Sequence, residues 1–218
     1  MTFDGGATAA AEPWFESVHR WGMTNISERD VADYDVGFWQ EQWERTGLQA
    51  VIANAVAGFA TYPIANSLIP RSRFAPCRDL LGEIRDAVAE SGMILCARMD
   101  SQLVSPDALD AYSDWRVLLP DGTRTKHMCI NSPYREEFVY PLYKEIIDRY
   151  GVKGFTDNGG VGASTLCHCG FCKKRWGDEV GGSLPTAASL ADAAYRDWLR
   201  WSDKIVLENW EQSHVYIR

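Results

Sequence analysis

Three closely spaced cysteines, Cys167, Cys169 and Cys172, are the side chains of this sequence best suited to hold a metal ion. Thiolates two and three residues apart can reach a single ion, and Cys129, one predicted helix upstream, is a candidate fourth ligand. Four sulfur ligands suit tetrahedral Zn²⁺, with Zn–S distances of about 2.3 Å. We therefore expect a structural zinc site that joins two loops at one rim of the fold.

The residues alone leave alternatives to this assignment open. His127 and His168 compete with Cys129 as the fourth ligand. Cys169 and Cys172 could instead form a redox pair, or the thiols could pack as core sulfur. Metal analysis and thiol titration separate these hypotheses, because a metal-bound cluster holds zinc and shows no thiol turnover.

Four polar residues form a second group that could do chemistry. Asn25, Asn54, Asp100 and Asp157 each lie at or just beyond the carboxyl end of a predicted strand. In a parallel α/β barrel these ends share one face, so the four side chains would line a single cleft. Capping of turns and helices is the simpler explanation for any one of them. Four such positions together favour a polar cleft.

Strand-like and helix-like segments alternate around these residues. Buried strands are expected over 23–26, 48–54, 93–100 and 152–157, and helices over 35–45, 79–91, 134–150 and 191–212, with residues 214–218 able to begin a fifth strand. Residues 106–125 are expected to form a loop or short helix, and Pro141 should bend the third helix. The helices follow from apolar side chains at helical spacing and from the glycines that end them.

This alternation predicts parallel strands joined by right-handed crossovers. A complete (β/α)₈ barrel needs roughly 250 residues, whereas this chain of 218 residues shows four or five βα units. We expect a TIM-type α/β barrel truncated to those units over residues 14–218, after a flexible lead-in over 1–13. A small open α/β sheet is the alternative. Because a partial barrel exposes strand edges, a homo-oligomer is expected.

Composition narrows the classes of function. The net charge of −8, without a block of lysine or arginine, argues against nucleic-acid binding. No apolar run approaches the ~20 residues of a membrane span. The first residues lack the pattern of a secretory signal, and the close cysteines suit a reducing compartment, so we expect a cytoplasmic protein. Trp21 and Trp115, near predicted loops, are candidate platforms for stacking sugar rings.

The segment from Asp114 to about Trp201 resembles glycoside hydrolase family 42 β-galactosidases and their uncharacterised barrel relatives. The resemblance is carried by Asp114-Trp115, Asp121-Gly122, the run Cys129-Ile130-Asn131-Ser132-Pro133-Tyr134-Arg135, Thr156-Asp157-Asn158 and the Cys-x-Cys-x-x-Cys run. It implies a zinc ion held by Cys129, Cys167, Cys169 and Cys172, with a role in stability. It also implies a sugar site at the strand ends.

The sequence departs from that family at one important position. The family's Asp-Asn pair is followed by an acid/base Glu, whereas Gly159 stands here, and the family's nucleophile comes from a later strand. We therefore predict a glycoside-hydrolase-like protein that hydrolyses or binds a neutral sugar. Asp157 would be the acid/base or nucleophile and Asp100 a second carboxylate, with substrate contacts from Asn158, Asn54, Arg98, Asn25, Trp21 and Trp115.

Two other functions compete with this prediction. The first is a non-catalytic, zinc-stabilised fragment that binds carbohydrate or drives oligomerisation. The second is a redox or zinc-ribbon-like interaction protein.

Overall fold

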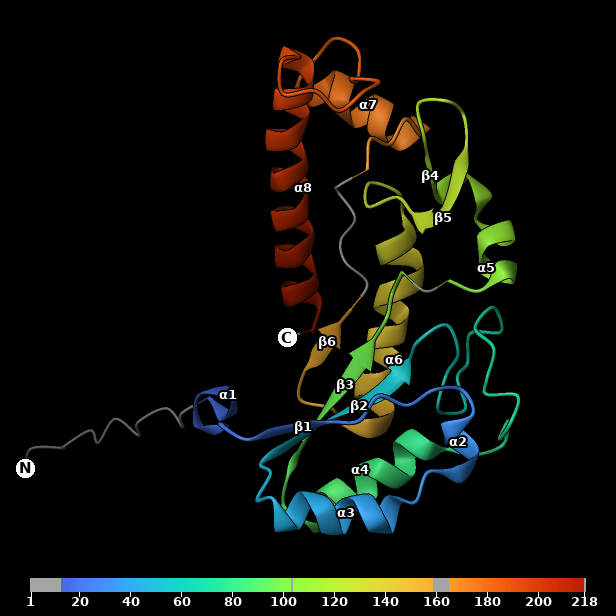
Figure 1. Ribbon diagram of the computed structural model, residues 1–218, viewed down its shortest axis with the longest axis vertical. Coiled ribbons are helices and arrows are strands. Elements are labelled where there is room, and N and C mark those ends of the chain that lie inside the picture. Colours follow the sequence, from blue (N-terminus) through green and yellow to red (C-terminus); the bar gives the residue numbers. More distant parts are fainter. Residues whose placement is uncertain (1–12, 103, 159–164, 218) are drawn as a thin grey trace, which may run out of the picture.

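A four-stranded parallel sheet forms half of a barrel. The computed structural model describes residues 13–102, 104–158 and 165–217, so the predicted lead-in lies outside the described residues except for Pro13. The strands are β1 (Trp21–Met23), β2 (Ala50–Val56), β3 (Ile94–Met99) and β6 (Phe155–Asp157), in the order β1-β2-β3-β6 (Figure 1). This α/β architecture confirms the predicted fold class.

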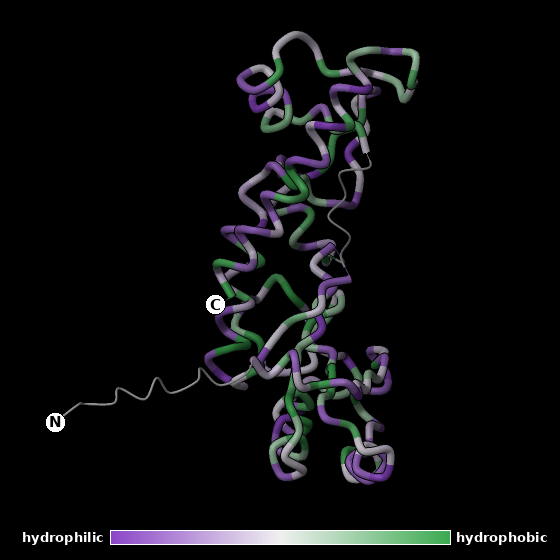
Figure 2. Tube along the Cα trace, turned by 90° about the vertical axis from the view of Figure 1, so that its left-hand side faces the viewer, coloured by the Kyte–Doolittle hydropathy of each residue, from purple (hydrophilic) through white to green (hydrophobic). Residues whose placement is uncertain are grey.

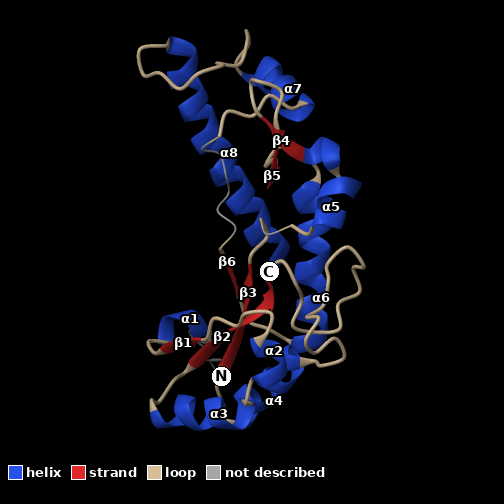
Figure 3. Ribbon diagram, turned by 45° about the vertical axis from the view of Figure 1, so that its right-hand side comes forward, coloured by secondary structure: helices blue, strands red, loops and turns tan. Residues whose placement is uncertain are grey.

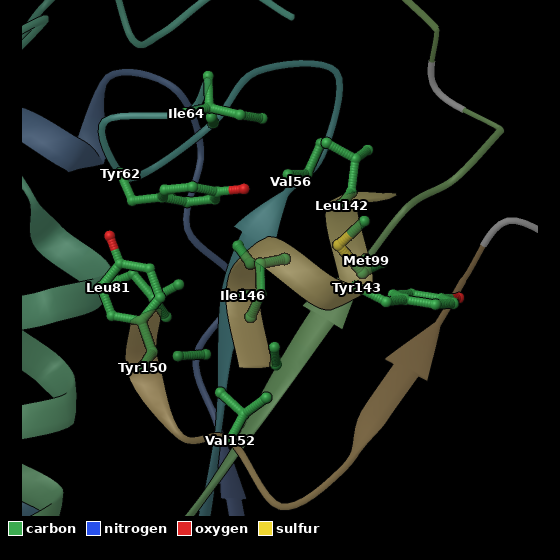
Figure 4. Close-up of a cluster of buried hydrophobic side chains, with 14 of the residues drawn as sticks. Val56, Tyr62, Ile64, Leu81, Met99, Leu142, Tyr143, Ile146, Tyr150 and Val152 are labelled. Carbon is green, nitrogen blue, oxygen red and sulfur yellow. The ribbon is translucent and has the colours of Figure 1, made fainter. Parts of the chain in front are cut away.

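Three helices build the main core against this sheet. They are α3 (Val36–Arg45), α4 (Leu80–Glu90) and α6 (Tyr140–Tyr150). Asp35 and Asp79 cap the first two by accepting hydrogen bonds from the amides of Phe38 and Gly82. Gly151 ends α6 in the left-handed conformation, at φ 63°, which a side chain would disfavour. Figure 4 shows Ile146 and Tyr143 of α6 among the buried side chains of β2 and β3.

The remaining elements flank the sheet or extend the molecule beyond it (Figures 1 and 3). They are α1 (Trp14–Ser17), α2 (Asp30–Asp33), α5 (Pro106–Ala111), a 3₁₀ turn (Ser113–Trp115), the antiparallel hairpin of β4 (Arg116–Leu118) and β5 (Arg124–Met128), a π-helical turn (Arg135–Val139), α7 (Gly170–Glu179) and α8 (Ala193–Ile217). The π-helical turn directly precedes α6, in the region where Pro141 was expected to bend the helix.

A second hydrophobic cluster lies at the hairpin end of the molecule. Trp176, Trp198, Trp201 and Ile205 from α7 and α8 pack there against Val117 and the cysteines. The indoles of Trp176 and Trp201 meet edge to face, with ring centroids 5.3 Å apart. This cluster is separate from the main core, so the hairpin end has its own source of stability.

The predicted fifth strand over 214–218 is wrong, because α8 continues to Ile217. Ser213 is buried against the π-helical turn, and the ring of Tyr216 stacks on Tyr140 with centroids 4.5 Å apart, so helical packing continues to the end of the segment. The strand prediction arose because Val215, Tyr216 and Ile217 have strong β propensity. Strands β1 and β2 are displaced by about two residues from their predicted positions.

None of the described helices is long and apolar enough to cross a lipid bilayer. Figure 2 shows hydrophilic and hydrophobic residues alternating along the long C-terminal helix, as expected of a helix with one buried face.

Candidate functional site

The four predicted cysteine ligands lie together. The Sγ atoms of Cys129, Cys167, Cys169 and Cys172 are all within 4.8 Å of one another, and all four residues are buried. Cys129 Sγ lies 3.4 Å from Cys172 Sγ and 3.5 Å from Cys169 Sγ. Tetrahedral zinc with Zn–S bonds of about 2.3 Å requires sulfurs about 3.8 Å apart. The cluster therefore has the size of a four-sulfur metal site.

Two separate segments supply these cysteines. Cys129 directly follows β5, and its amide donates to the Trp115 carbonyl at 2.7 Å. Cys167 and Cys169 precede α7, whereas Cys172 lies in its first turn. The amide of His168 donates to the Leu118 carbonyl at 2.7 Å and ties the second segment to the hairpin. The cluster thus joins the hairpin to α7.

The electrostatics of the cluster suit a cation. Hydrogen bonding among the four sulfurs lowers the pKa of Cys167 and of Cys169, which favours their thiolate forms, and raises the pKa of Cys129 and of Cys172. The side-chain amide of Asn131 donates to Cys172 Sγ at 3.3 Å. Arg175 in turn donates to Asn131 Oδ1 at 2.9 Å and orients that amide. The thiolate form is thus favoured at Cys167 and Cys169, and the Asn131 amide is placed to stabilise negative charge on Cys172.

The histidines that competed for the fourth position are not part of this group. His168 Nε2 pairs with the Pro185 carbonyl at 2.9 Å, and His127 is exposed. All six cysteines are free, and the separations of 3.4 and 3.5 Å between Cys129 Sγ and its two neighbouring sulfurs exceed the ~2.05 Å of a disulfide bond. The arrangement is that of convergent ligands.

Several predicted sugar ligands lie side by side on neighbouring strands or contact one another. Asn54 in β2 is the register partner of Arg98 in β3, and an Arg98 guanidinium nitrogen donates to Asn25 Oδ1. Asn54 is 3% exposed, and within the described part of the chain its Oδ1 has no hydrogen-bond partner. Arg98 also forms an ion pair with Asp100 at 3.3 Å, in which both side chains are largely buried. Asn25, Asn54, Arg98 and Asp100 are therefore connected or adjacent.

Asp157 lies in a different environment. Its Oδ1 accepts from the Ser101 amide at 3.0 Å, and its Oδ2 accepts from the Ser101 hydroxyl at 2.6 Å. The Tyr143 hydroxyl donates to it at 3.4 Å, and the Arg135 guanidinium lies 3.9 Å away. Arg98 in β3 is the register partner of Thr156 in β6, so these two side chains lie on the same face of the sheet. Side chains alternate along a strand, and Asp157 therefore lies on the opposite face, toward α6. The two predicted carboxylates thus have different partners.

The other predicted contacts are dispersed. Asn158 is exposed just beyond β6. Trp21 begins β1, is 42% exposed and lies beside Trp14 with ring centroids 5.9 Å apart. Trp115 stacks on Tyr112 at 4.2 Å and packs against the main core. Gly159, at the family's acid/base position, lies outside the described residues.

A groove of about 480 Å³ crosses the segments that follow β1, β2 and β3, and its residues were not predicted. Its lining includes Glu28, Phe59, Gln102, Leu109 and Lys126. Glu28 and Gln102 are polar residues a few positions beyond strand ends, which is the signal that could have identified them. Phe59 and Lys126 come from a loop and from the unpredicted hairpin, so only the fold brings them together.

Comparison with known proteins gives structural likenesses only. No protein-family model matches the chain, and no curated protein matches it. α-L-Fucosidase isoenzyme 2 from Paenibacillus thiaminolyticus superposes with a TM-score of 0.68 and 16% identity, over 91% of this chain and 30% of the fucosidase chain. A β-galactosidase from the Antarctic haloarchaeon Halorubrum lacusprofundi gives a TM-score of 0.62 and 20% identity, over 92% and 35%.

A third solved structure is comparable in extent to this chain. A hypothetical protein from Ruminiclostridium thermocellum gives a TM-score of 0.50 and 8% identity, over 85% of this chain and 92% of its own. The chain thus spans about a third of the fucosidase and galactosidase chains that it matches. At these identities the likeness shows the fold alone. The chain therefore has the fold of part of a glycoside hydrolase barrel, with a buried four-cysteine cluster that could hold a metal ion.

Proposed function

We propose that this chain is a glycoside hydrolase family 42-like domain that binds a neutral sugar at the carboxyl ends of its strands and holds a structural zinc ion. The observation that carries the proposal is the convergence of four buried Sγ atoms within 4.8 Å between the hairpin and α7. Four thiolates complete a tetrahedral zinc site and leave no position open for substrate, so the ion would stabilise the fold.

The sugar ligands in this proposal are the groups near Arg98. Sugar hydroxyls both donate and accept hydrogen bonds, and this region offers the Arg98 guanidinium, the Asp100 carboxylate and the Asn25 amide. Asn54 Oδ1 adds a buried acceptor that lacks a partner in the described part of the chain. A buried acceptor without a partner is costly, so a hydroxyl donor would be favoured there.

Hydrolysis requires two carboxyl groups on either side of the scissile bond. Asp157 remains the proposed acid/base or nucleophile and Asp100 the second carboxylate, although Asp157 faces α6 and Asp100 pairs with Arg98 on the other face of the sheet. The contacts of Asp157 with Ser101 and Arg135 also suit a purely structural carboxylate. Sugar binding is therefore the part of the proposal with more support, and a zinc-stabilised binding domain is the second candidate function.

Binding is tested by titrating the purified chain with methyl galactoside and methyl fucoside, followed by ligand-observed NMR. We expect binding that weakens several-fold in Asn25→Ala, because Asn25 is exposed and its loss should leave the fold intact. Gln212→Ala, at an exposed position on α8, is the matched control and should bind as the parent does. If the chain binds neither methyl galactoside nor methyl fucoside, the proposed function is overturned.

Hydrolysis is tested separately with chromogenic glycosides. A positioned general acid or base contributes about 10²–10⁴-fold, so Asp157→Asn should reduce any turnover by that factor. Unchanged rates in this variant would remove Asp157 from the mechanism.

A further inference from the structure

The groove beyond β1, β2 and β3 has the size of a ligand site. Its volume of about 480 Å³ falls within the ~300–1,000 Å³ typical of small-molecule pockets. Glu28 follows β1, Phe59 follows β2 and Gln102 follows β3, while Leu109 on α5 and Lys126 on β5 complete the wall. In a parallel α/β fold this edge of the sheet is where ligands bind.

One wall of the groove is apolar and held in place. Phe59 and Leu109 are partly buried and pack against the main core, so their positions are restrained from behind. Each still lines the groove. Aromatic and aliphatic side chains in the lining suit the C–H face of a pyranose, which combines an apolar face with a polar edge.

Two acceptors belong to other residues that line the groove. Gln102 Oε1 is buried and has no hydrogen-bond partner within residues 13–102, 104–158 and 165–217, so a ligand hydroxyl would satisfy it. Glu28 accepts a hydrogen bond from the Arg73 amide at 3.0 Å and pairs with the Arg73 guanidinium at 3.3 Å. Its carboxylate is thereby oriented and its charge balanced.

Lys126 adds a positive charge that the described residues do not balance. Side chains alternate along a strand, so Lys126 leaves β5 on the same side as Met128. Met128 is buried in the main core, which also contains Ala108 of α5, so this side of β5 faces α5 and the groove. No ion pair links the Lys126 ammonium to any described carboxylate. The groove therefore carries an uncompensated cation in a chain with a net charge of −8.

We propose that this groove binds an acidic sugar unit, a uronic acid, beside the neutral-sugar site at the strand ends. The Lys126 ammonium pairs with the sugar carboxylate, Gln102 Oε1 accepts from a ring hydroxyl, and the ring lies against Phe59 and Leu109. The inference rests on the proposed carbohydrate function and adds a second unit of different charge. The intact ligand would be a glycan that contains both acidic and neutral residues.

The test compares galacturonate with galactose by isothermal titration calorimetry at low salt, using the whole chain. An ion pair with the exposed Lys126 ammonium predicts that galacturonate binds several-fold more tightly. Lys126→Met should abolish that preference, because it keeps most of the aliphatic stem and removes the charge. Lys173→Met is the matched control, since Lys173 is an exposed lysine on α7 without an ion pair among the described residues, and it should retain the preference.

The outcomes separate the two proposals. Equal affinity for the two sugars, or an unchanged preference in Lys126→Met, would overturn the acidic subsite and leave the neutral-sugar function standing. Binding of neither sugar would overturn both. Circular dichroism of the exposed-residue variant Lys126→Met establishes that a lost preference reflects lost charge in a folded chain.

Discussion

Replacing Asp157 by asparagine should destabilise the fold whatever the protein's activity. The carboxylate is 7% exposed and accepts from the Ser101 amide and hydroxyl at 3.0 and 2.6 Å, and it lies 3.9 Å from the Arg135 guanidinium. An asparagine keeps one oxygen but places an NH₂ group toward these donors. It also leaves Arg135, whose side chain is 9% exposed, without its charged partner.

The magnitude follows from the burial of this pair. Removing one partner of a buried ion pair costs about 3–5 kcal/mol. In a chain of this size each kcal/mol lowers Tm by roughly 2–4 °C, so the variant should melt about 6–20 °C below the parent. Asp148→Asn is the matched control, because its 2.7 Å pair with Lys144 is solvent-exposed and should contribute less than about 1 kcal/mol.

The assay is thermal unfolding followed by circular dichroism, with activity measured well below the lower Tm. A parent-like Tm in Asp157→Asn would refute the structural role assigned to these contacts. A lower Tm together with normal turnover would separate stability from catalysis and assign Asp157 to the fold.

Three further predictions concern charge, thiols and association. Arg98→Met should lower the free energy of unfolding by about 3–5 kcal/mol in urea titrations, because it leaves Asp100 buried without its cation; an unchanged midpoint would contradict this. At pH 8 the native chain should expose one reactive thiol, Cys77, to an aromatic disulfide reagent. Burial raises the pKa of Cys96 to about 11, so its nucleophilic thiolate forms only at higher pH, and rapid reaction of several native thiols would oppose this prediction. The exposed Leu207 and Trp210 of α8 and the open sheet edges predict self-association in sedimentation equilibrium, and a monomer at high concentration would count against it.

The sequence predicted elements whose own residues determine them. The apolar stripe of α4 lies between Asp79, which caps the helix, and Gly92, which adopts positive φ beyond its end. The cysteine spacing likewise predicted a cluster, because Cys169 and Cys172 can reach one ion within a single loop and helical turn. Local signals were sufficient in both cases.

Elements without an apolar pattern could not be predicted in this way. Strand β5 contains Arg-Thr-Lys-His-Met, with Met128 its only residue in the main core, and α7 is rich in lysine and arginine around the buried Cys172 and Trp176. Both are held by tertiary contacts around the cysteine cluster. Propensity is a weak guide where packing decides the conformation.

The site required knowledge of which face each side chain occupies. Arg98 and Asn25 meet although 73 residues separate them. The parity of the strand directs Asp157 toward Tyr143 of α6, and a shift of one residue would have directed it to the other face. The alternation of strands and helices predicted at which edge of the sheet these residues lie. It could not predict on which face of the sheet each side chain lies.

The zinc content of the purified chain tests the central claim most directly. Chain isolated without chelators and analysed by inductively coupled plasma mass spectrometry should contain one zinc per molecule. Cys129→Ser should lose that ion, because the cluster needs sulfur from both segments, whereas Cys77→Ser, at an exposed cysteine outside the cluster, should retain it. A parent protein without zinc, or a Cys129→Ser variant with a full equivalent, would contradict the account.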